Sequence, residues 1–252
     1  MILEERAYIK MKFSKRMDLF GESIFTTLAN MRSERKKQGL EVIDLSIGAP
    51  NIPPTQEVME TIAKEAMKPE NYLYAIKDAV DLQNTVKEWY ERRYGVVIDP
   101  TTELTSLLGS QDGLAHLALT LVDEGDIVLV QDPCYPIFRD GPLLAGAHVV
   151  TMPLLKENDY LIDFDMIDEK TAQDAKYMIV SYPNNPTCGV ANDEFYKKLI
   201  VFAKKYNIMV LHDNAYSELL FEGPGHSFLE FEGAKDVGIE FNSLSKTYGL
   251  AG

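Results

Sequence analysis

The chain has 252 residues, of which 46 % are apolar and 25 % charged, a composition typical of a soluble globular protein with one large domain or two small ones. The formal net charge is −14, from 39 acidic residues against 25 lysines and arginines. Because nucleic acids and anionic membrane surfaces attract basic proteins, this balance argues against both kinds of partner.

The cysteines and the N-terminal sequence indicate the cellular compartment. Cys134 and Cys188 are the two cysteines, and we expect both to be reduced thiols in loops, outside any pattern typical of zinc sites. The first twenty residues lack the apolar core of a signal peptide, and no stretch approaches the ~18 apolar residues of a membrane span. We therefore expect a cytoplasmic protein, with Met11 as an alternative start to Met1.

Helical periodicity and capping residues predict three helices in the first hundred residues. Gly39 is suited to end the first helix, Thr55 to begin the second, and Gly95 to end the third. Residues 41–54 form a short extended run that ends in a Gly/Pro loop. The expected helices cover residues 22–39, 55–68 and 79–95.

From residue 103 onward, short apolar runs alternate with helical patterns, which is typical of an α/β fold with a mainly parallel sheet. In such sheets ligands bind beyond the carboxyl ends of the strands, so the loops that follow the strands are the place to expect a site. The expected strands cover residues 103–110, 126–133, 147–154, 175–183, 207–216 and 237–245. The expected helices cover residues 111–122, 135–146 with an interruption at Pro142, and 192–206.

Two of these loops could bind an anion or a flat ring. In "GSQDG", the small residues Gly109 and Ser110 stand at a helix start, where free N–H groups attract anions. A plain helix cap at Ser110 is the simpler interpretation of that motif alone. Tyr135, held between prolines in "DPCYP", could stack on a flat ring or merely pack in its loop.

Three further loops carry polar side chains. Asn185 in "NNPTCG" could donate a hydrogen bond to a ligand, or serve only in a turn. Asp213 in "DNAY" could hold a protonated ring nitrogen, with Tyr216 beside it, or could only cap a loop. Lys246 in "SLSK" could be a Schiff-base nucleophile if its pKa falls from ~10.4, although a lone lysine is more often a surface charge.

Taken together, the loops offer an anion site, an aromatic ring, an amide donor, a carboxylate and a lysine, which a phosphorylated, pyridine-containing aldehyde requires. From about Phe13 to Gly252 the sequence resembles the class I/II aminotransferases, pyridoxal-phosphate enzymes of the aspartate-aminotransferase fold. The strongest motif is "SLSKTYGLAG", supported by "YPNNPTCG" and "DNAY". The resemblance implies a three-layer α/β/α fold with a mainly parallel central sheet and an incomplete small domain.

The resemblance also implies a division of the chain and a set of catalytic roles. Residues 1–46 would be an arm and part of the small domain, and residues 47–252 the large domain that binds pyridoxal 5′-phosphate. Lys246 would form the Schiff base with the cofactor and then move the proton between the substrate Cα and the cofactor. Asp213 would keep the pyridine nitrogen protonated.

Further cofactor contacts follow from the same resemblance. Tyr216 and Asn185 would bond the ring hydroxyl oxygen, and Tyr135 would stack on the ring. Gly48 in "LSIGAP" would lie near the substrate carboxylate. The phosphate would be held by Ser110, Gln111, Ser243 and Ser245.

Tyr74 would reach the phosphate of the neighbouring subunit, which implies a homodimer, and Tyr72 is the alternative for this role. The family has a glycine and an arginine shortly after this tyrosine, where this chain has Asp78 or Ala79, and Gln83. This departure affects the alignment of the loop and leaves the other motifs unchanged.

Two more departures concern Cys188 and the last residue. Cys188 stands where the commoner form of its motif has Thr directly before Gly, and we expect a passive thiol there. The family motif continues past Gly252 to an arginine that binds the phosphate. We therefore expect the sequence to be a fragment that lacks this arginine and the substrate-binding C-terminal domain, with weakened cofactor binding and turnover.

The predicted function is amino-group transfer between an L-amino acid and a 2-oxo acid. Alternatives are another reaction with the same cofactor (a C–S β-lyase, a decarboxylase or a synthase similar to ACC synthase), an inactive truncated fragment, or a regulator. Tyr216 weighs against members that carry His at that place. A dinucleotide dehydrogenase is excluded by the lack of a G-x-G-x-x-G motif after the first strand.

Overall fold

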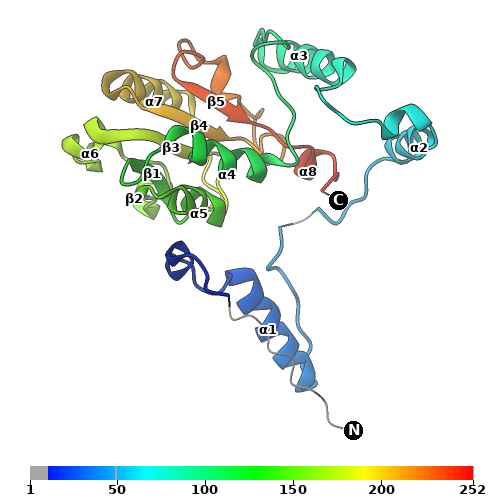
Figure 1. The fold of residues 1–252 in the computed structure, drawn as a ribbon, viewed down its shortest axis with the longest axis horizontal. Helices are drawn as coiled ribbons and strands as arrows, with labels where there is room; N and C mark the ends of the chain where they lie inside the picture. The colour runs from blue at the N-terminus through cyan, green and yellow to red at the C-terminus, as the bar shows by residue number, and fades with distance from the viewer. Residues whose placement is uncertain (1–10, 49, 252) are drawn as a thin grey trace. The chain divides into compact units, whose positions relative to one another are not determined.

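The computed structural model describes residues 11–48 and 50–251 (Figure 1). The chain divides into two compact units, Met1–Ile47 and Gly48–Gly252. The prediction for Gly252, and the choice between Met1 and Met11 as the start, lie outside the described residues. The division of the chain into a large cofactor domain and part of a small one stays a prediction.

The first unit contains one α-helix among its described residues. It comprises the 3₁₀ helix η1 (Lys15–Leu19) and helix α1 (Ile24–Lys37), and α1 confirms the helix expected at residues 22–39. An ion pair between Arg32 and Asp44 joins α1 to the extended run that follows it.

The second unit begins with two helices whose ends match the capping residues in the sequence. Helix α2 (Gln56–Glu65) starts after Thr55, whose hydroxyl accepts a hydrogen bond from the Val58 N–H group at 3.4 Å. Helix α3 (Val80–Tyr94) ends at Gly95, which has a φ of 69°. Glycine adopts this left-handed conformation at little cost, so it is suited to end a helix.

The centre of the second unit is a five-stranded parallel sheet with the strand order β2-β1-β3-β4-β5. This arrangement confirms the predicted fold class. The parallel order requires a crossover connection between consecutive strands, and α-helices provide each of these except the one across residues 214–237. The strands are β1 (Ile127–Asp132), β2 (His148–Pro153), β3 (Ala175–Ser181), β4 (Met209–Asp213) and β5 (Gly238–Phe241).

Helices cover both faces of this sheet, with α4 and α5 on one side and α7 on the other (Figure 1). The helices are α4 (Ser110–Leu121), α5 (Pro136–Ala145), α6 (Glu169–Asp174), α7 (Asp193–Tyr206) and α8 (Leu244–Thr247). Short 3₁₀ helices are η2 (Pro69–Tyr72), η3 (Lys156–Asn158), η4 (Phe164–Met166) and η5 (Phe228–Glu230).

Each central strand buries apolar side chains on both faces. In β3, Tyr177 and Ile179 belong to the core beneath α4 and α5, whereas Met178 and Val180 belong to the core beneath α7. Successive side chains of a strand point to opposite faces, which explains this alternation. The continuous apolar runs in the sequence are therefore typical of a sheet covered on both sides.

The strand expected at residues 103–110 is absent from the described sheet, so this prediction is wrong. No described strand pairs with the segment, and the Leu108 side chain is 97 % exposed. The Ser106 N–H group donates instead to the Asp78 carboxylate at 3.0 Å. An apolar run becomes a strand only where a neighbouring strand can receive its backbone hydrogen bonds.

The predicted interruption of α5 at Pro142 is wrong. The buried ring of Pro142 lies inside the helix, which continues to Ala145 and ends at Gly146, where φ is 96°. A proline inside a helix removes one backbone hydrogen bond, and burial of its ring against the core offsets that loss here. The short helices α6 and α8 were not predicted from the sequence.

The register of the strands determines which residues meet at the carboxyl edge of the sheet. Ser181 at the end of β3 lies opposite Asp213 at the end of β4, and Asp213 lies opposite Phe241 at the end of β5. The loops that follow these three residues therefore start at neighbouring points of one edge.

Two leucines provide a test of where stability resides. Leu129 in β1 is 0 % exposed and Leu108 is 97 % exposed. We expect Leu129→Ala to lower the free energy of unfolding by about 2–5 kcal/mol, because it leaves a cavity in the core. Leu108→Ala should change it by less than about 0.5 kcal/mol. Urea unfolding of both variants measures this, and equal losses would contradict the assigned core.

Candidate functional site

Asp213 is a buried acid with an unused hydrogen-bonding atom. It ends β4 and is only 7 % exposed. Its Oδ1 atom is buried and has no hydrogen-bond partner among the described residues. Burial raises the pKa of Asp213 to about 6, the charge of Glu240 adds to this rise, and a protonated His212 would oppose it. A buried acceptor of this kind is costly unless a donor reaches it.

Asn185 and Tyr216 approach each other beside this acid. The Asn185 Nδ2 group donates to the Tyr216 hydroxyl at 3.5 Å. The preceding Asn184 is buried, and its Oδ1 atom accepts from the backbone N–H of Thr187 at 3.0 Å and from its hydroxyl at 2.8 Å. These bonds hold the loop that presents Asn185. Burial, followed by the charge of Asp213, raises the pKa of Tyr216.

Lys246 lies on α8, the turn of helix that follows β5. Ser243 caps this helix, with its hydroxyl oxygen accepting from the Ser245 N–H group at 3.1 Å. The Lys246 Nζ atom donates to the Gly48 carbonyl oxygen at 2.7 Å and lies 5.9 Å from the centre of the Tyr216 ring. Lys246, Gly48 and Tyr216 therefore share one location.

Tyr135 connects two of the predicted contacts. Its hydroxyl donates to the Gln111 Oε1 atom at 2.9 Å, which joins the loop before α5 to the start of α4. Ser110 is the first residue of α4, directly after Gly109, whose φ is 89°. Burial, followed by the charge of Asp213, raises the pKa of Tyr135, so this ring also lies on the side of the sheet edge that Asp213 faces.

Some of the predicted site residues do not lie with the others at the sheet edge. Tyr74 is 96 % exposed and makes no side-chain hydrogen bond within the described part of the chain. Tyr72 is 72 % exposed, and its hydroxyl donates to the Ala66 carbonyl oxygen at 2.5 Å. The phosphate role of Ser245 also stays a prediction.

One buried polar cluster was missed from the sequence. Glu240 in β5 accepts hydrogen bonds from Tyr90, His212 and Ser227, and neither its side chain nor that of His212 is exposed. The signal in the sequence is an acid inside the apolar run "VGIEF". Such an acid is usually read as a residue on an exposed strand face.

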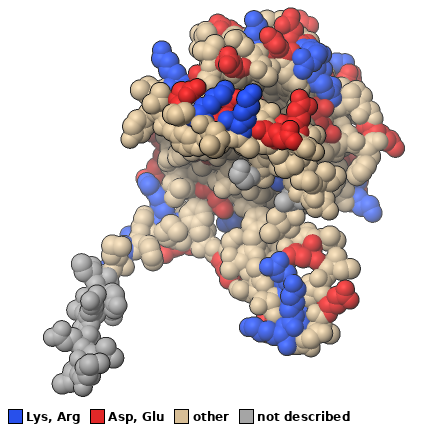
Figure 2. All heavy atoms as spheres, turned by 90° about the vertical axis from the view of Figure 1, so that its right-hand side faces the viewer, with Lys and Arg blue, Asp and Glu red and all other residues tan. Residues whose placement is uncertain are grey.

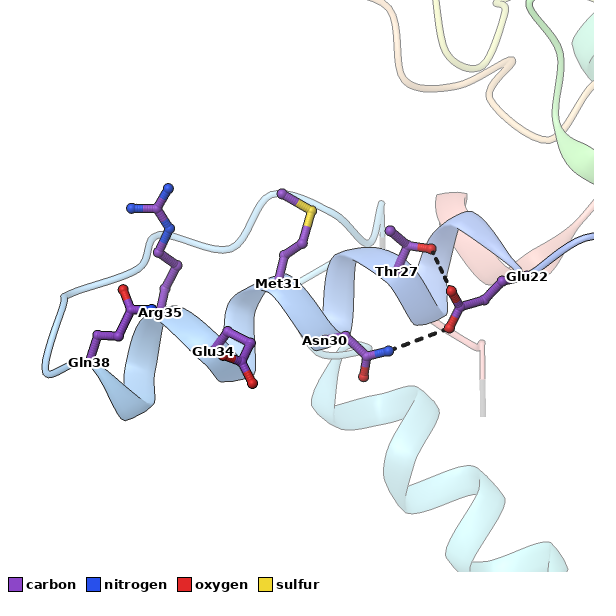
Figure 3. Close-up of a pocket in the computed structure, with 7 residues that line it drawn as sticks. All are labelled: Glu22, Thr27, Asn30, Met31, Glu34, Arg35 and Gln38. Atoms are coloured by element: carbon purple, nitrogen blue, oxygen red, sulfur yellow. Dashed lines mark hydrogen bonds between the residues drawn. The ribbon is translucent and has the colours of Figure 1, made fainter.

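A hollow of about 310 Å³ lies along α1 in the first unit, and none of the predicted site residues lines it. Figure 3 shows that its side chains come from one helix and the residues beside it, with Thr27 and Asn30 both pointing toward the Glu22 carboxylate. Its sides are exposed to solvent and it gathers no reactive groups. We therefore place the candidate site at the sheet edge.

The face that Figure 2 presents carries charged side chains of both signs, with Lys and Arg interspersed with Asp and Glu. Within residues 11–48 and 50–251, no helix is both long and apolar enough to cross a bilayer. In the same described ranges, no group of three or more His, Cys, Asp and Glu side chains could hold a metal ion. Cys134 and Cys188 are both free.

The residues at the sheet edge fit pyridoxal 5′-phosphate. The unused Oδ1 atom of Asp213 can accept a hydrogen bond from a protonated ring nitrogen. Asn185 and Tyr216 can bond a ring oxygen, and Lys246 supplies an amine. The start of α4 offers free N–H groups for a phosphate. Acceptor, donors and amine therefore match the chemical groups of the cofactor.

Comparison with known proteins gives the family. The model of the family "Aminotransferase class I and II" matches residues 41–252. A relative from Aquifex aeolicus (strain VF5) named LL-diaminopimelate aminotransferase is 43 % identical over 96 % of this chain. The chain spans 63 % of the length of that relative.

Two solved structures have the same fold. Apo-BacF from Bacillus subtilis is 36 % identical with a TM-score of 0.89, over 96 % of this chain and 62 % of its own. A probable N-succinyldiaminopimelate aminotransferase from Thermus thermophilus is 34 % identical with a TM-score of 0.86, over 91 % of this chain and 62 % of its own. The chain belongs to the class I and II aminotransferase family.

Proposed function

We propose that the protein is a pyridoxal-phosphate-dependent aminotransferase, which exchanges an amino group between an L-amino acid and a 2-oxo acid. The observation that carries the proposal is the buried Asp213 Oδ1 atom, which lacks a donor among the described residues at the sheet edge where Lys246 and Tyr216 meet. Membership of the aminotransferase family supports the same reaction.

The proposed catalytic roles follow from what each side chain can do. When bound, the cofactor supplies a ring that accepts electrons from the substrate Cα. Asp213 receives the protonated ring nitrogen at its unused oxygen. Lys246 would present its Nζ amine to the aldehyde of the cofactor and would hold or move the proton at the substrate Cα. Asn185 and Tyr216 orient the ring through its hydroxyl oxygen.

Further residues hold the two ends of the cofactor and the substrate. Tyr135 stacks on the ring, and its bond to Gln111 keeps the aromatic plane in place. The phosphate lies at the start of α4 and near the cap of α8, where free N–H groups and hydroxyls bind anions. Gly48 lies by the substrate carboxylate. The proposed phosphate ligands are Ser110, Gln111, Ser243 and Ser245.

The names of two similar proteins guide the choice of substrate. Both the Aquifex relative and the Thermus structure are named for diaminopimelate or a derivative of it. We propose LL-diaminopimelate as the first amino donor to test, with a panel of 2-oxo acids as acceptors. Release of ammonia in place of transfer would instead favour a lyase reaction with the same cofactor.

The assembly and location belong to the same proposal. We propose a cytoplasmic homodimer, in which Tyr74 of one subunit reaches the phosphate in the other. The 96 % exposure of Tyr74 within one chain leaves it available for this contact. Residues 47–252 are proposed as the large cofactor domain, and residues 1–46 as the arm and part of the small domain.

Replacing the lysine tests the proposed chemistry. We expect Lys246→Ala to lower amino-group transfer by at least about 10³-fold, because it removes the proton carrier, and to abolish the visible absorbance that covalent attachment gives the cofactor. Lys197→Ala, which removes an exposed lysine of α7, is the control and should leave both unchanged. Retention of the absorbance by Lys246→Ala would contradict the proposal.

Asp213 gives a test by stability in the protein without cofactor. Its pKa of about 6 when folded lies above its ordinary 3.8. The folded protein therefore binds more protons than the unfolded chain between about pH 4 and 6, and its free energy of unfolding falls as pH rises through that window. Asp213→Asn lacks this fall. As the pH rises from about 4 to 6, its free energy of unfolding should therefore increase by on the order of 3 kcal/mol relative to that of the wild type.

Urea unfolding at several pH values measures this difference. Asp132→Asn, at the exposed end of β1, is the matched control and should show no comparable change between pH values. An Asp213→Asn variant that follows the wild-type pH dependence would show that Asp213 is not the buried acid described above.

Mixing variants tests the shared site. Tyr74→Phe and Lys246→Ala proteins should each be impaired, and exchange of their subunits should restore part of the activity. The restored site takes its lysine from one subunit and its tyrosine from the other. Tyr72→Phe mixed with Lys246→Ala is the control that separates the two tyrosines. No recovery with either pair would argue against a site shared between subunits.

A further inference from the structure

Glu240 is a fully buried carboxylate surrounded by donors. Its oxygens accept from the Tyr90 hydroxyl at 2.8 Å, the Ser227 hydroxyl at 2.9 Å and the Phe228 N–H group at 2.8 Å. The His212 Nδ1 atom lies 3.2 Å away. An ionised carboxylate has no proton to donate and can accept from all of these groups, so the contacts favour the ionised form of Glu240 over the acid.

His212 joins Glu240 to Tyr196 through its two ring nitrogens. Its Nδ1 atom faces Glu240 at 3.2 Å, and its Nε2 atom lies 3.3 Å from the Tyr196 hydroxyl. With one proton on Nδ1, the ring donates to Glu240 and accepts from Tyr196, so each hydrogen has a partner. In a charged ring Nε2 would donate to Tyr196, and the hydroxyl hydrogen would lack an acceptor among the described residues.

His212 is the one basic side chain paired with Glu240 among the residues the structure describes, and no lysine or arginine there forms an ion pair with it. Besides Asp213, the titratable groups that sense the charge of Glu240 are the phenols of Tyr90, Tyr94 and Tyr196, and burial is the first cause of the raised pKa of each.

This buried charge lies directly behind the proposed cofactor site. In the parallel pair of β4 and β5, His212 is opposite Glu240 and Asp213 is opposite Phe241. Because successive side chains of a strand alternate between faces, Asp213 faces the site while His212 and Glu240 lie behind it. After burial, the pKa of Asp213 is lowered by the charge of a protonated His212 and raised by that of Glu240.

We propose that Glu240 is a positioning residue that makes the sheet edge at Asp213 select a cationic nitrogen heterocycle over a neutral ring of the same shape. Its charge makes the local potential more negative, and its bond to His212 anchors the end of β4 that presents Asp213. The inference rests on the proposed cofactor site, and it adds a residue and the charge of the ligand that the site prefers.

The physical consequence is a proton balance at the site. Burial, with the charge of Glu240 adding to it, raises the pKa of Asp213 to about 6, so the acid form predominates only below that pH in protein without cofactor. Asp213 would hold the ring nitrogen of a bound pyridine in its protonated form, as an ionised carboxylate beside a cation. The phenols of Tyr135 and Tyr216 are the other titratable groups that sense Asp213, and both stay neutral.

The test compares Glu240→Gln, which removes the charge, with Tyr90→Phe, which removes one donor and keeps the charge. In protein without cofactor, carboxyl ¹³C NMR measures the pKa of Asp213, with Asp213→Asn identifying the resonance. We expect a lower pKa in Glu240→Gln and the wild-type pKa in Tyr90→Phe. A residue that only stabilised the fold would not separate the two variants in this way.

The second readout is selectivity between ligands. Pyridoxal 5′-phosphate is compared with its analogue in which carbon replaces the ring nitrogen, so that no cationic ring can form. We expect Glu240→Gln to weaken binding of the cofactor about tenfold relative to the analogue, and Tyr90→Phe to leave the ratio unchanged. An unchanged ratio and an unchanged pKa of Asp213 in Glu240→Gln would overturn the inference.

The outcomes also separate this inference from the proposed function. A wild-type protein that binds no pyridoxal 5′-phosphate would overturn the proposed function, while the pKa comparison would still decide the role of Glu240. Should Glu240→Gln not fold, the Glu240 carboxyl resonance of the wild type decides. An ionised carboxylate at pH 7 supports the inference, and a protonated acid overturns it.

Discussion

A buried acceptor without a donor among the described residues is the constraint on which the candidate site depends. An unsatisfied carboxylate oxygen costs free energy in the folded protein, and Asp213 retains it at the end of a strand with apolar cores on both faces. The register of β4 with β3 and β5 places the acid at this edge of the sheet. The folded chain thus sustains a local cost that a ligand with one suitable donor would remove.

The other groups are brought to Asp213 by short loops with their own hydrogen bonds. Asn184 closes the loop that presents Asn185, and Ser243 caps the helix that carries Lys246. Each loop leaves a neighbouring strand end of the same parallel sheet, so few residues are needed to make the side chains converge. The site is therefore a consequence of the topology first and of the particular loop sequences second.

Much of this could be predicted from the sequence, for identifiable reasons. Lys246, Asp213, Asn185 and Tyr216 follow apolar strands, and parallel topology places such residues at one edge. Glu240 could not be predicted, because periodicity cannot tell a buried acid with four donors from an exposed one. Residues 103–110 were wrongly predicted as a strand, because an apolar run does not reveal whether a partner strand lies beside it. The role of Tyr74 depends on a second chain, which no local pattern describes.

The two ends of the candidate site at the sheet edge differ in charge. Asp213, with Glu240 behind it, makes one end negative. The first turn of α4 attracts negative charge, since the N–H groups at a helix start are free. A ligand with a cationic ring at one end and an anionic group at the other complements both. Because the two ends attract opposite charges, they would favour one orientation of such a ligand over the reverse one.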